Sequence, residues 1–190
     1  MDGLDYYAPH ALVQLDRHVA LAGPPAVDLA PIGHYLASLC GITFHELARL
    51  VEHDAGMSWA KLAKRARGKE LERQVAKTLR RALADRPFGV IVVGHLPLPW
   101  RLRWRLRRKT RLLYIDRPLN MAIQSARKHR ARTREQFPEF MPGGLLNAGR
   151  LRAAHEDRRR DYQRMATILE VGEAPTLRVA QQIKTLIEGG

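Results

Sequence analysis

Three short apolar runs define the framework of the chain. Each run ends in a turn signal: residues 19–22 end at Gly23, residues 90–93 at Gly94, and residues 112–115 at Asp116. Continuous apolar runs bounded by such signals are typical of strands buried on both faces of a parallel sheet. We therefore predict three buried strands here, and a further short strand at residues 168–171.

Amphipathic segments fill the intervals between these runs. Apolar side chains recur at helical spacing in the segments that we predict to be helices: residues 31–39, 58–84, 119–134, 146–165 and 176–188. Strands that alternate with helices indicate a central parallel sheet with helices on both faces, which is a three-layer α/β/α fold. We assign this fold to residues 18–190 as one domain, and residues 1–17 to an N-terminal extension.

The charge of the chain points to anionic partners. Lysine and arginine outnumber aspartate and glutamate by 33 to 19, which gives a formal net charge of +14 at pH 7. A strongly basic surface attracts nucleic acid or phosphorylated metabolites. No apolar run approaches the length of a membrane span, and residues 1–5 are acidic where a secretory signal would be basic. We therefore expect a cytoplasmic protein that does not span a membrane.

Cysteine and histidine give no indication of metal chemistry. The single cysteine, Cys40, lies in an apolar helical segment, which favours a buried, inert thiol over a nucleophile. The eight histidines lack the paired short intervals of a zinc site. We therefore assign no metal ligands.

Residues 23–33, between the first predicted strand and helix, have the position and length of a phosphate-binding loop. In such a loop, backbone N–H groups cradle a triphosphate, a lysine reaches its outer phosphates, and a serine or threonine holds magnesium. Here the sequence is Gly-Pro-Pro-Ala-Val-Asp-Leu-Ala-Pro-Ile-Gly, in which only the outer glycines, Gly23 and Gly33, remain. The residues that would hold phosphate and magnesium are therefore missing.

Four further sequence motifs follow the loop along the chain. They are Phe-His-Glu-Leu-Ala-Arg-Leu-Val-Glu at residues 44–52, Ala-Gly-Met-Ser at 55–58, Gly-Lys-Glu-Leu-Glu at 68–72, and Arg158 followed by Tyr162. Together with the loop, they resemble the shikimate kinase family of P-loop small-molecule kinases, from His18 to Ile183 without large gaps. The resemblance implies the three-layer P-loop kinase architecture, with a lid near residues 127–146.

By this resemblance, the loop has lost each residue that the family uses to hold ATP. The inner glycines fall on Ala26 and Asp28, the lysine on Leu29, and the magnesium-binding hydroxyl on Ala30. A carboxylate about 4 Å from a phosphate charge opposes binding by about 1 to 4 kcal/mol, depending on the local dielectric. We therefore expect no cofactor, because ATP and magnesium binding should be lost or weak.

The resemblance implies a parallel change on the shikimate-binding side. Ala48 stands where the family has an aspartate that binds the ring hydroxyls and acts on the attacking hydroxyl, whereas Glu46 is a conservative change. Lys69 replaces a carboxylate-binding arginine, so the charge remains but the bidentate fork is lost. We expect Glu46 and Lys69 to be remnants of an anion or substrate pocket.

The family's triple glycine after the third strand corresponds to Gly94-His95-Leu96. Glycine lets the backbone approach a substrate closely, so the two added side chains would fill that space. We interpret His95 as a structural histidine that fills the old pocket. The alternative is a new catalytic base, which would need an orienting partner that the sequence does not identify.

Two features concern the lid and the helix after it. The family's Arg-Pro-Leu-Leu corresponds to Gly-Gly-Leu-Leu at residues 143–146, and the nearby arginines 130, 132 and 134 could substitute only if the lid folds differently. Arg158 is the best candidate for a surviving carboxylate-binding residue. The alternative is an ion pair between Arg158 and Asp157 or Glu156 on a helix surface.

Residues 98–111 alternate apolar and basic side chains almost strictly. This period alone predicts a strand, but the resemblance implies a helix, on which Leu98, Leu102 and Leu106 form one stripe. Trp100 and Trp104 then lie on another face among arginines that include Arg101 and Arg105. Such a face suits a protein partner, single-stranded nucleic acid or an anionic membrane, or it is a solvated face on which arginine stems cover the indoles. We favour the solvated face or a protein contact, because no nucleic-acid-binding motif accompanies the charge.

Three hypotheses for the function follow. The first is a catalytically degenerate shikimate kinase-like protein, more a scaffold for a protein or a small anionic ligand than an enzyme. The second is a divergent ATP-dependent small-molecule kinase that uses Lys69 or lid arginines in place of the loop lysine. The third is a basic nucleic-acid-binding module that uses Trp100 and Trp104.

Overall fold

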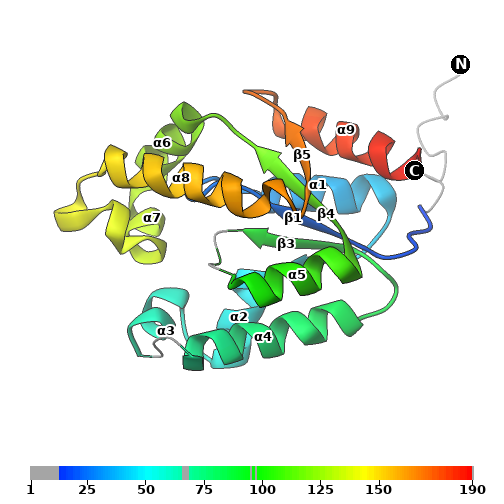
Figure 1. Ribbon diagram of the computed structural model, residues 1–190, viewed down its shortest axis with the longest axis horizontal. Coiled ribbons are helices and arrows are strands. Elements are labelled where there is room, and N and C mark those ends of the chain that lie inside the picture. Colours follow the sequence, from blue (N-terminus) through cyan, green and yellow to red (C-terminus); the bar gives the residue numbers. More distant parts are fainter. Residues whose placement is uncertain (1–12, 66–68, 95, 97, 190) are drawn as a thin grey trace, which may run out of the picture.

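The computed structural model describes residues 13–65, 69–94, 96 and 98–189. Within these residues, five parallel strands form one sheet in the order β2-β3-β1-β4-β5 (Figure 1). Their bounds are β1 (His18–Ala22), β2 (Phe44–Glu46), β3 (Val90–Gly94), β4 (Thr110–Asp116) and β5 (Thr167–Glu170). The three apolar runs form the three central strands, so the predicted parallel sheet is confirmed. The edge strand β2 is an addition to that prediction.

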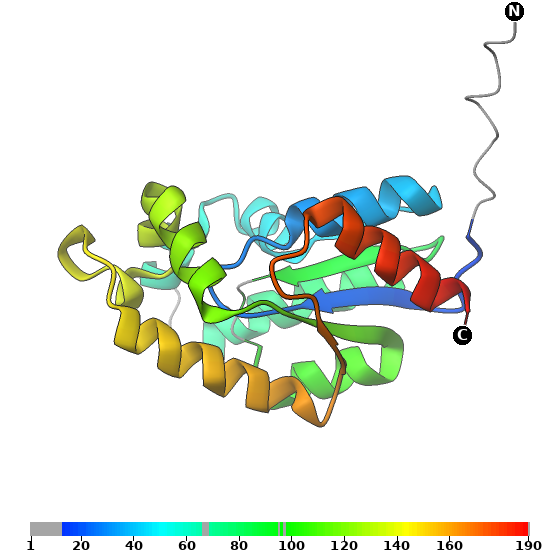
Figure 2. The ribbon, with the colours of Figure 1, turned by 90° about the horizontal axis from the view of Figure 1, so that it is seen from above.

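Helices cover both faces of the sheet and its carboxyl end. In chain order they are α1 (Ala30–Cys40), α2 (Leu47–Ala55), α3 (Trp59–Arg65), α4 (Lys69–Ala84), α5 (Trp100–Lys109), α6 (Leu119–Lys128), α7 (Arg130–Gln136), α8 (Ala148–Gln163) and α9 (Thr176–Glu188), with short 3-10 turns at Pro138–Phe140 and Pro142–Gly144. In Figure 2, α1 and α9 lie side by side on one face of the sheet, and α5 and α8 lie on the other. The predicted three-layer α/β/α fold is confirmed.

The strands divide their side chains between two cores. On β1, Val19 and Leu21 pack with α1 and α9, whereas Ala20 and Ala22 pack with α2, α4 and α5. Successive side chains on a strand point to opposite faces, so one apolar run supplies both cores. This double burial explains why β1, β3 and β4 could be recognised as unbroken apolar runs.

Close packing of α1 against the sheet depends on Gly33. An ideal Cβ at this position would lie 2.4 Å from Val92 Cγ2 and 2.8 Å from Phe44 Cε2. Only glycine permits this approach, so Gly33 has the packing role expected of a retained outer glycine. The first turn of α1, which follows the loop at residues 23–29, is thereby held against the first residue of β2 and the middle of β3.

Two predicted helices are wrong in extent. The segment 58–84 contains two helices, α3 and α4, and residues 66–68 between them lie outside the described residues. Glu70 and Glu72 in the first turn of α4 favour a new helix start there. The segment 119–134 is divided at His129, whose φ of −106° and ψ of 37° are not helical. No glycine or proline marks that break, so the apolar pattern could not reveal it.

The segment around α5 is a helix. This confirms the helix that the resemblance implied, and the strand predicted from the strict alternation is wrong. Leu98, Leu102 and Leu106 are all buried in the core that α5 shares with α2 and α4.

Of the predicted extension, residues 1–12 lie outside the described residues, while the Val13 N–H donates to the Cys40 carbonyl at 3.2 Å. Among the described helices, none combines the length and apolar character needed to cross a membrane.

Candidate functional site

The carboxyl ends of β2 and β3 meet the loop at residues 23–29 and helix α7 around a small cavity. Its lining includes Asp28, Glu46, Ala48 and Arg132. The cavity has a volume of about 30 Å³, which leaves room for about one or two water molecules. The structure therefore brings the loop, part of the predicted substrate side and the lid together, but leaves little space between them.

The loop has an unusual backbone conformation at a residue that is not glycine. Ala26 has a φ of 62°, the only positive φ of a non-glycine residue in the described part of the chain. An L-residue in this left-handed region is strained by about 1 to 2 kcal/mol. The loop thus keeps a geometry suited to glycine at a position that the resemblance assigns to one.

Leu29 and Ala30 cannot supply the groups that a nucleotide with magnesium requires. The Leu29 side chain is buried in the core between α1 and the sheet, and an ideal Cβ on Gly23 would lie 2.9 Å from Leu29 Cδ1. Leu29 therefore packs inward against the loop, where it offers no cation. Ala30 has no hydroxyl for a metal. These residues do not fit ATP and magnesium.

Asp28 places a negative charge at the N-terminus of α1. The Ala30 N–H donates to Asp28 Oδ1 at 3.1 Å, and Arg132 Nη1 of the lid donates to Asp28 Oδ2 at 3.0 Å. The N-terminus of a helix attracts anions because its first N–H groups lack intrahelical partners. The Asp28 carboxylate therefore lies at a place where a bound phosphate would be stabilised.

Arg132 joins the lid to the substrate side as well. Its Nη2 lies 3.6 Å from Glu46 Oε1, and Arg49 lies 3.7 Å from the other oxygen of Glu46. Burial raises the pKa of the Glu46 carboxyl, while Arg49 and Arg132 act in the opposite direction. We refer to Asp28, Glu46 and Arg132 as the lid clasp.

Of the other predicted pocket residues in the described part of the chain, only Gly94 lines this cavity. Within the described residues, Lys69 is exposed at the start of α4 and Gly94 lines the cavity with a φ of 61°. His95 lies outside the described residues. Neither Lys69 nor Arg158 is among the described residues that line the cavity at the clasp.

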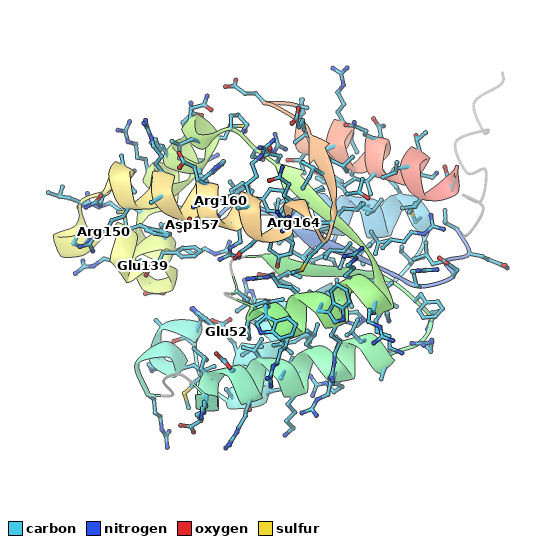
Figure 3. The ribbon with its side chains drawn as sticks, in the orientation of Figure 1. Glu52, Glu139, Arg150, Asp157, Arg160 and Arg164 are labelled. Atoms are coloured by element: carbon cyan, nitrogen blue, oxygen red, sulfur yellow. The ribbon has the colours of Figure 1, made fainter. Side chains whose placement is uncertain are left out.

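Arg158 contacts the segment that follows β3. Its Nη1 donates to the Leu96 carbonyl at 3.2 Å, and the side chain lines a separate hollow of about 250 Å³ with Arg103 and Tyr162. The neighbouring carboxylate of Asp157 pairs with Arg160 along α8 (Figure 3). The alternative role for Arg158 was a surface ion pair with Asp157 or Glu156. Among the described ion pairs, Arg160 is the residue that pairs with Asp157.

The lid clasp is the arrangement that sequence reasoning missed. The sequence indicates Arg132 as one of three arginines that could substitute for the family's lid arginine, but it does not predict a pairing of Arg132 with Asp28. A signal was present, because an acidic residue in an anion-binding loop and a row of arginines in the lid invite a pairing. Asp28 and Arg132 are 104 positions apart in the sequence, so the sequence alone could not identify which arginine would be the partner.

The surface predicted for a partner is exposed. Trp100 and Trp104 are 59% and 43% exposed, and Arg101 and Arg105 are exposed beside them on α5. Trp59, in contrast, is buried. The structure therefore separates two regions, the clasped cleft and the outer face of α5.

Comparisons with known proteins agree on the fold. A family model described as shikimate kinase matches residues 30–188. The structure is similar to shikimate kinase from Acinetobacter baumannii in complex with shikimate, with a TM-score of 0.78 and 18% identity over 91% of this chain and 93% of that chain. It is also similar to shikimate kinase from Bacteroides thetaiotaomicron, with a TM-score of 0.76 and 14% identity over 90% of this chain and 98% of that chain.

A third similar structure has a different name. Gluconokinase from Sinorhizobium meliloti 1021 matches with a TM-score of 0.58 and 15% identity over 93% of this chain and 97% of that chain. No curated protein shows significant similarity to this chain. At such identities the structural matches show the fold, and the match of the family model over residues 30–188 carries the family assignment.

Proposed function

The chain belongs to the shikimate kinase family, and from that premise we propose that it is a member that has lost phosphotransfer and acts as a binding or regulatory scaffold. The observation that carries this proposal is the position of Asp28. Its carboxylate lies at the N-terminus of α1 and pairs with a lid arginine. The protein thus provides its own anion where its relatives would bind a phosphate.

Electrostatics support this proposal. A phosphate at the start of α1 would approach the Asp28 carboxylate, and two like charges about 4 Å apart repel by about 1 to 4 kcal/mol. The buried Leu29 side chain supplies no cation to offset that repulsion. Phosphoryl transfer depends on positioning and on stabilisation of charge, so the loss of the lysine and of the metal-binding hydroxyl removes most of the means of catalysis.

The lid supports the same conclusion. Substrate pockets commonly enclose about 300 to 1,000 Å³, whereas the cavity at the clasp has a volume of about 30 Å³. Arg132 is held by Asp28 and Glu46, so it is not available to replace a loop lysine. A divergent kinase would therefore have to break the clasp before any nucleotide entered.

Calorimetric titration with ATP and magnesium tests the proposal. We expect no saturable binding to the wild-type protein at micromolar concentrations. The triple variant Asp28→Gly, Leu29→Lys, Ala30→Ser should gain binding, because it removes the competing carboxylate and restores a cation and a hydroxyl. The matched control is Glu156→Lys, which changes the net charge by the same two units on the exposed side of α8.

The outcomes distinguish a scaffold from an enzyme. Micromolar binding of ATP to the wild-type protein, or release of ADP that depends on shikimate, would overturn the proposal. A gain of binding in Glu156→Lys equal to that in the triple variant would show that bulk charge, and not the loop, controls nucleotide affinity.

A further inference from the structure

The outer face of α5 combines exposed indoles with uncompensated positive charge. The helix reads Trp-Arg-Leu-Arg-Trp-Arg-Leu-Arg-Arg-Lys and contains no acidic residue. Trp100 and Trp104 lie one helical turn apart and are 59% and 43% exposed. Exposure of two large aromatic side chains among cations is unusual for a plain solvated surface.

The cations of α5 form two sets. Arg103 donates to Asp161 Oδ2 at 2.8 Å, and Arg107 donates to the Arg164 carbonyl at 3.1 Å, so both are tied to α8 and the turn that follows it. The second set is Arg101, Arg105, Arg108 and Lys109, for which the described part of the chain provides no ion pair. The positive charge of this second set is available to a partner.

The second set surrounds a hollow beside Trp104. The hollow has a volume of about 360 Å³, and Trp104 and the four cations of the second set form its lining. The Arg107 guanidinium lies 5.1 Å from the centre of the Trp104 ring, which orients the indole at the surface. The hollow therefore has one aromatic wall and several cationic ones.

We propose that this face of α5 binds single-stranded nucleic acid. An unpaired base can stack on the Trp104 indole while neighbouring phosphates contact the second set of cations, which is how proteins hold single strands without reading their sequence. On α4, which packs into the same core as α5, Arg73, Lys77 and Arg80 line a separate hollow together with Arg65 and Glu70. This inference does not depend on the fate of the phosphate loop.

Other anionic partners fit the face less well. An amphipathic helix that binds a membrane inserts its apolar stripe, but the stripe of Leu98, Leu102 and Leu106 is buried in the core. Tryptophan and arginine are both common at protein interfaces, but the core of such an interface is depleted of charge, whereas four cations surround Trp104. A duplex keeps its bases stacked inside, so the indole could not reach them.

Quenching of tryptophan fluorescence by an oligothymidylate of about 20 nucleotides tests the proposal. We expect saturable quenching in which the logarithm of the binding constant falls with the logarithm of salt concentration, with a slope near −3 for about four phosphate contacts. Arg105→Glu with Arg108→Glu should weaken binding at least about tenfold and reduce the slope by about 1.4. Trp104→Ala should weaken binding on the order of tenfold and leave the slope unchanged.

The matched control is Arg152→Glu with Arg178→Glu, which changes the net charge equally at exposed positions on α8 and α9. We expect this control to bind within about twofold of wild type. Circular dichroism should show that all variants remain folded, because every substituted side chain is exposed.

Several results would overturn the proposal. They are equal affinity for a duplex of the same length, no effect of Trp104→Ala, or equal weakening by the control pair. Equal or stronger quenching by phosphatidylserine vesicles or by polyglutamate would assign the face to a membrane or to an acidic protein instead.

Discussion

The cleft under the lid and the outer face of α5 use arginine in opposite ways. In the cleft, Arg132 meets Asp28 at 3.0 Å and Glu46 at 3.6 Å, and little space remains between these side chains. On α5, within the described residues, the cations around Trp104 have no carboxylate partner. The net charge of +14 is therefore distributed unevenly. Positive charge is paired with carboxylates at the clasp and is exposed without such partners on α5.

The largest effect is expected from a change that displaces the start of α1. The clasp depends on this region because Asp28 accepts a hydrogen bond from the Ala30 N–H there. Gly33→Ala places a Cβ 2.4 Å from Val92 Cγ2, so we expect a loss of about 2 to 3 kcal/mol in the free energy of unfolding from overpacking. Urea unfolding measures this loss. The control is Gly149→Ala on α8, where the nearest atom would lie 3.6 Å away and a small gain from helix propensity is expected. Equal effects of the two changes would contradict the close packing of α1.

A direct test compares the two sets of arginines. Arg132→Ala leaves the half-buried Glu46 without its lid partner, so we expect a loss of about 1 kcal/mol in the free energy of unfolding. The estimate is modest because the Arg132 and Asp28 side chains are 40% and 31% exposed and solvent screens their attraction.

Removal of two cations from α5, by Arg105→Ala with Arg108→Ala, should change stability by less than about 0.5 kcal/mol, because no carboxylate partner is lost. Hydrogen exchange should show faster exchange in α7 for Arg132→Ala and no change there for the α5 pair. If the α5 pair destabilises the protein as much as Arg132→Ala does, the contrast between the regions is wrong.

The smallest expected effect is a dependence on pH that only the cleft should show. Burial raises the pKa of Glu46 above its usual value, so the folded state binds a proton more readily than the unfolded state. This contribution to stability is fully present below the unfolded pKa and is lost as pH rises through the folded pKa. Relative to Glu46→Gln, the wild type should therefore gain stability as pH falls from 7 toward 4.5.

The α5 pair provides the control for this measurement. Arginine stays protonated throughout this range, so the difference in unfolding free energy between wild type and Arg105→Ala with Arg108→Ala should not vary with pH. A constant difference between wild type and Glu46→Gln would show that burial does not perturb this carboxyl.

Local patterns predicted the elements whose signal lies within one segment. The central strands are apolar on both faces, and α9 has a regular apolar stripe that ends before Gly189, so both were found from sequence. β2 spans only Phe44–Glu46, which is too short for a pattern. The division of the helix at His129 has no glycine or proline to mark it.

The candidate site was predictable only in part. The sequence shows Asp28, Leu29 and Ala30 at loop positions where the resemblance implies a glycine, a lysine and a hydroxyl, and their effect on nucleotide binding stays a prediction. The new role of Asp28 could not be read, because it requires a partner brought close by the fold. The α5 face was predicted with its two exposed indoles, whereas the hollow beside Trp104 depends on side-chain positions that a periodic pattern does not contain.

The separation of 104 positions between Asp28 and Arg132 also has a consequence for the order of folding. Closure of so long a loop is entropically unfavourable until other contacts have shortened it. We therefore expect the clasp to form after β1, β3 and β4 have assembled. By the same reasoning, it should open as a local unfolding unit while the sheet stays intact. A partner that captured the opened lid would then gain access to the cleft without unfolding the rest of the domain.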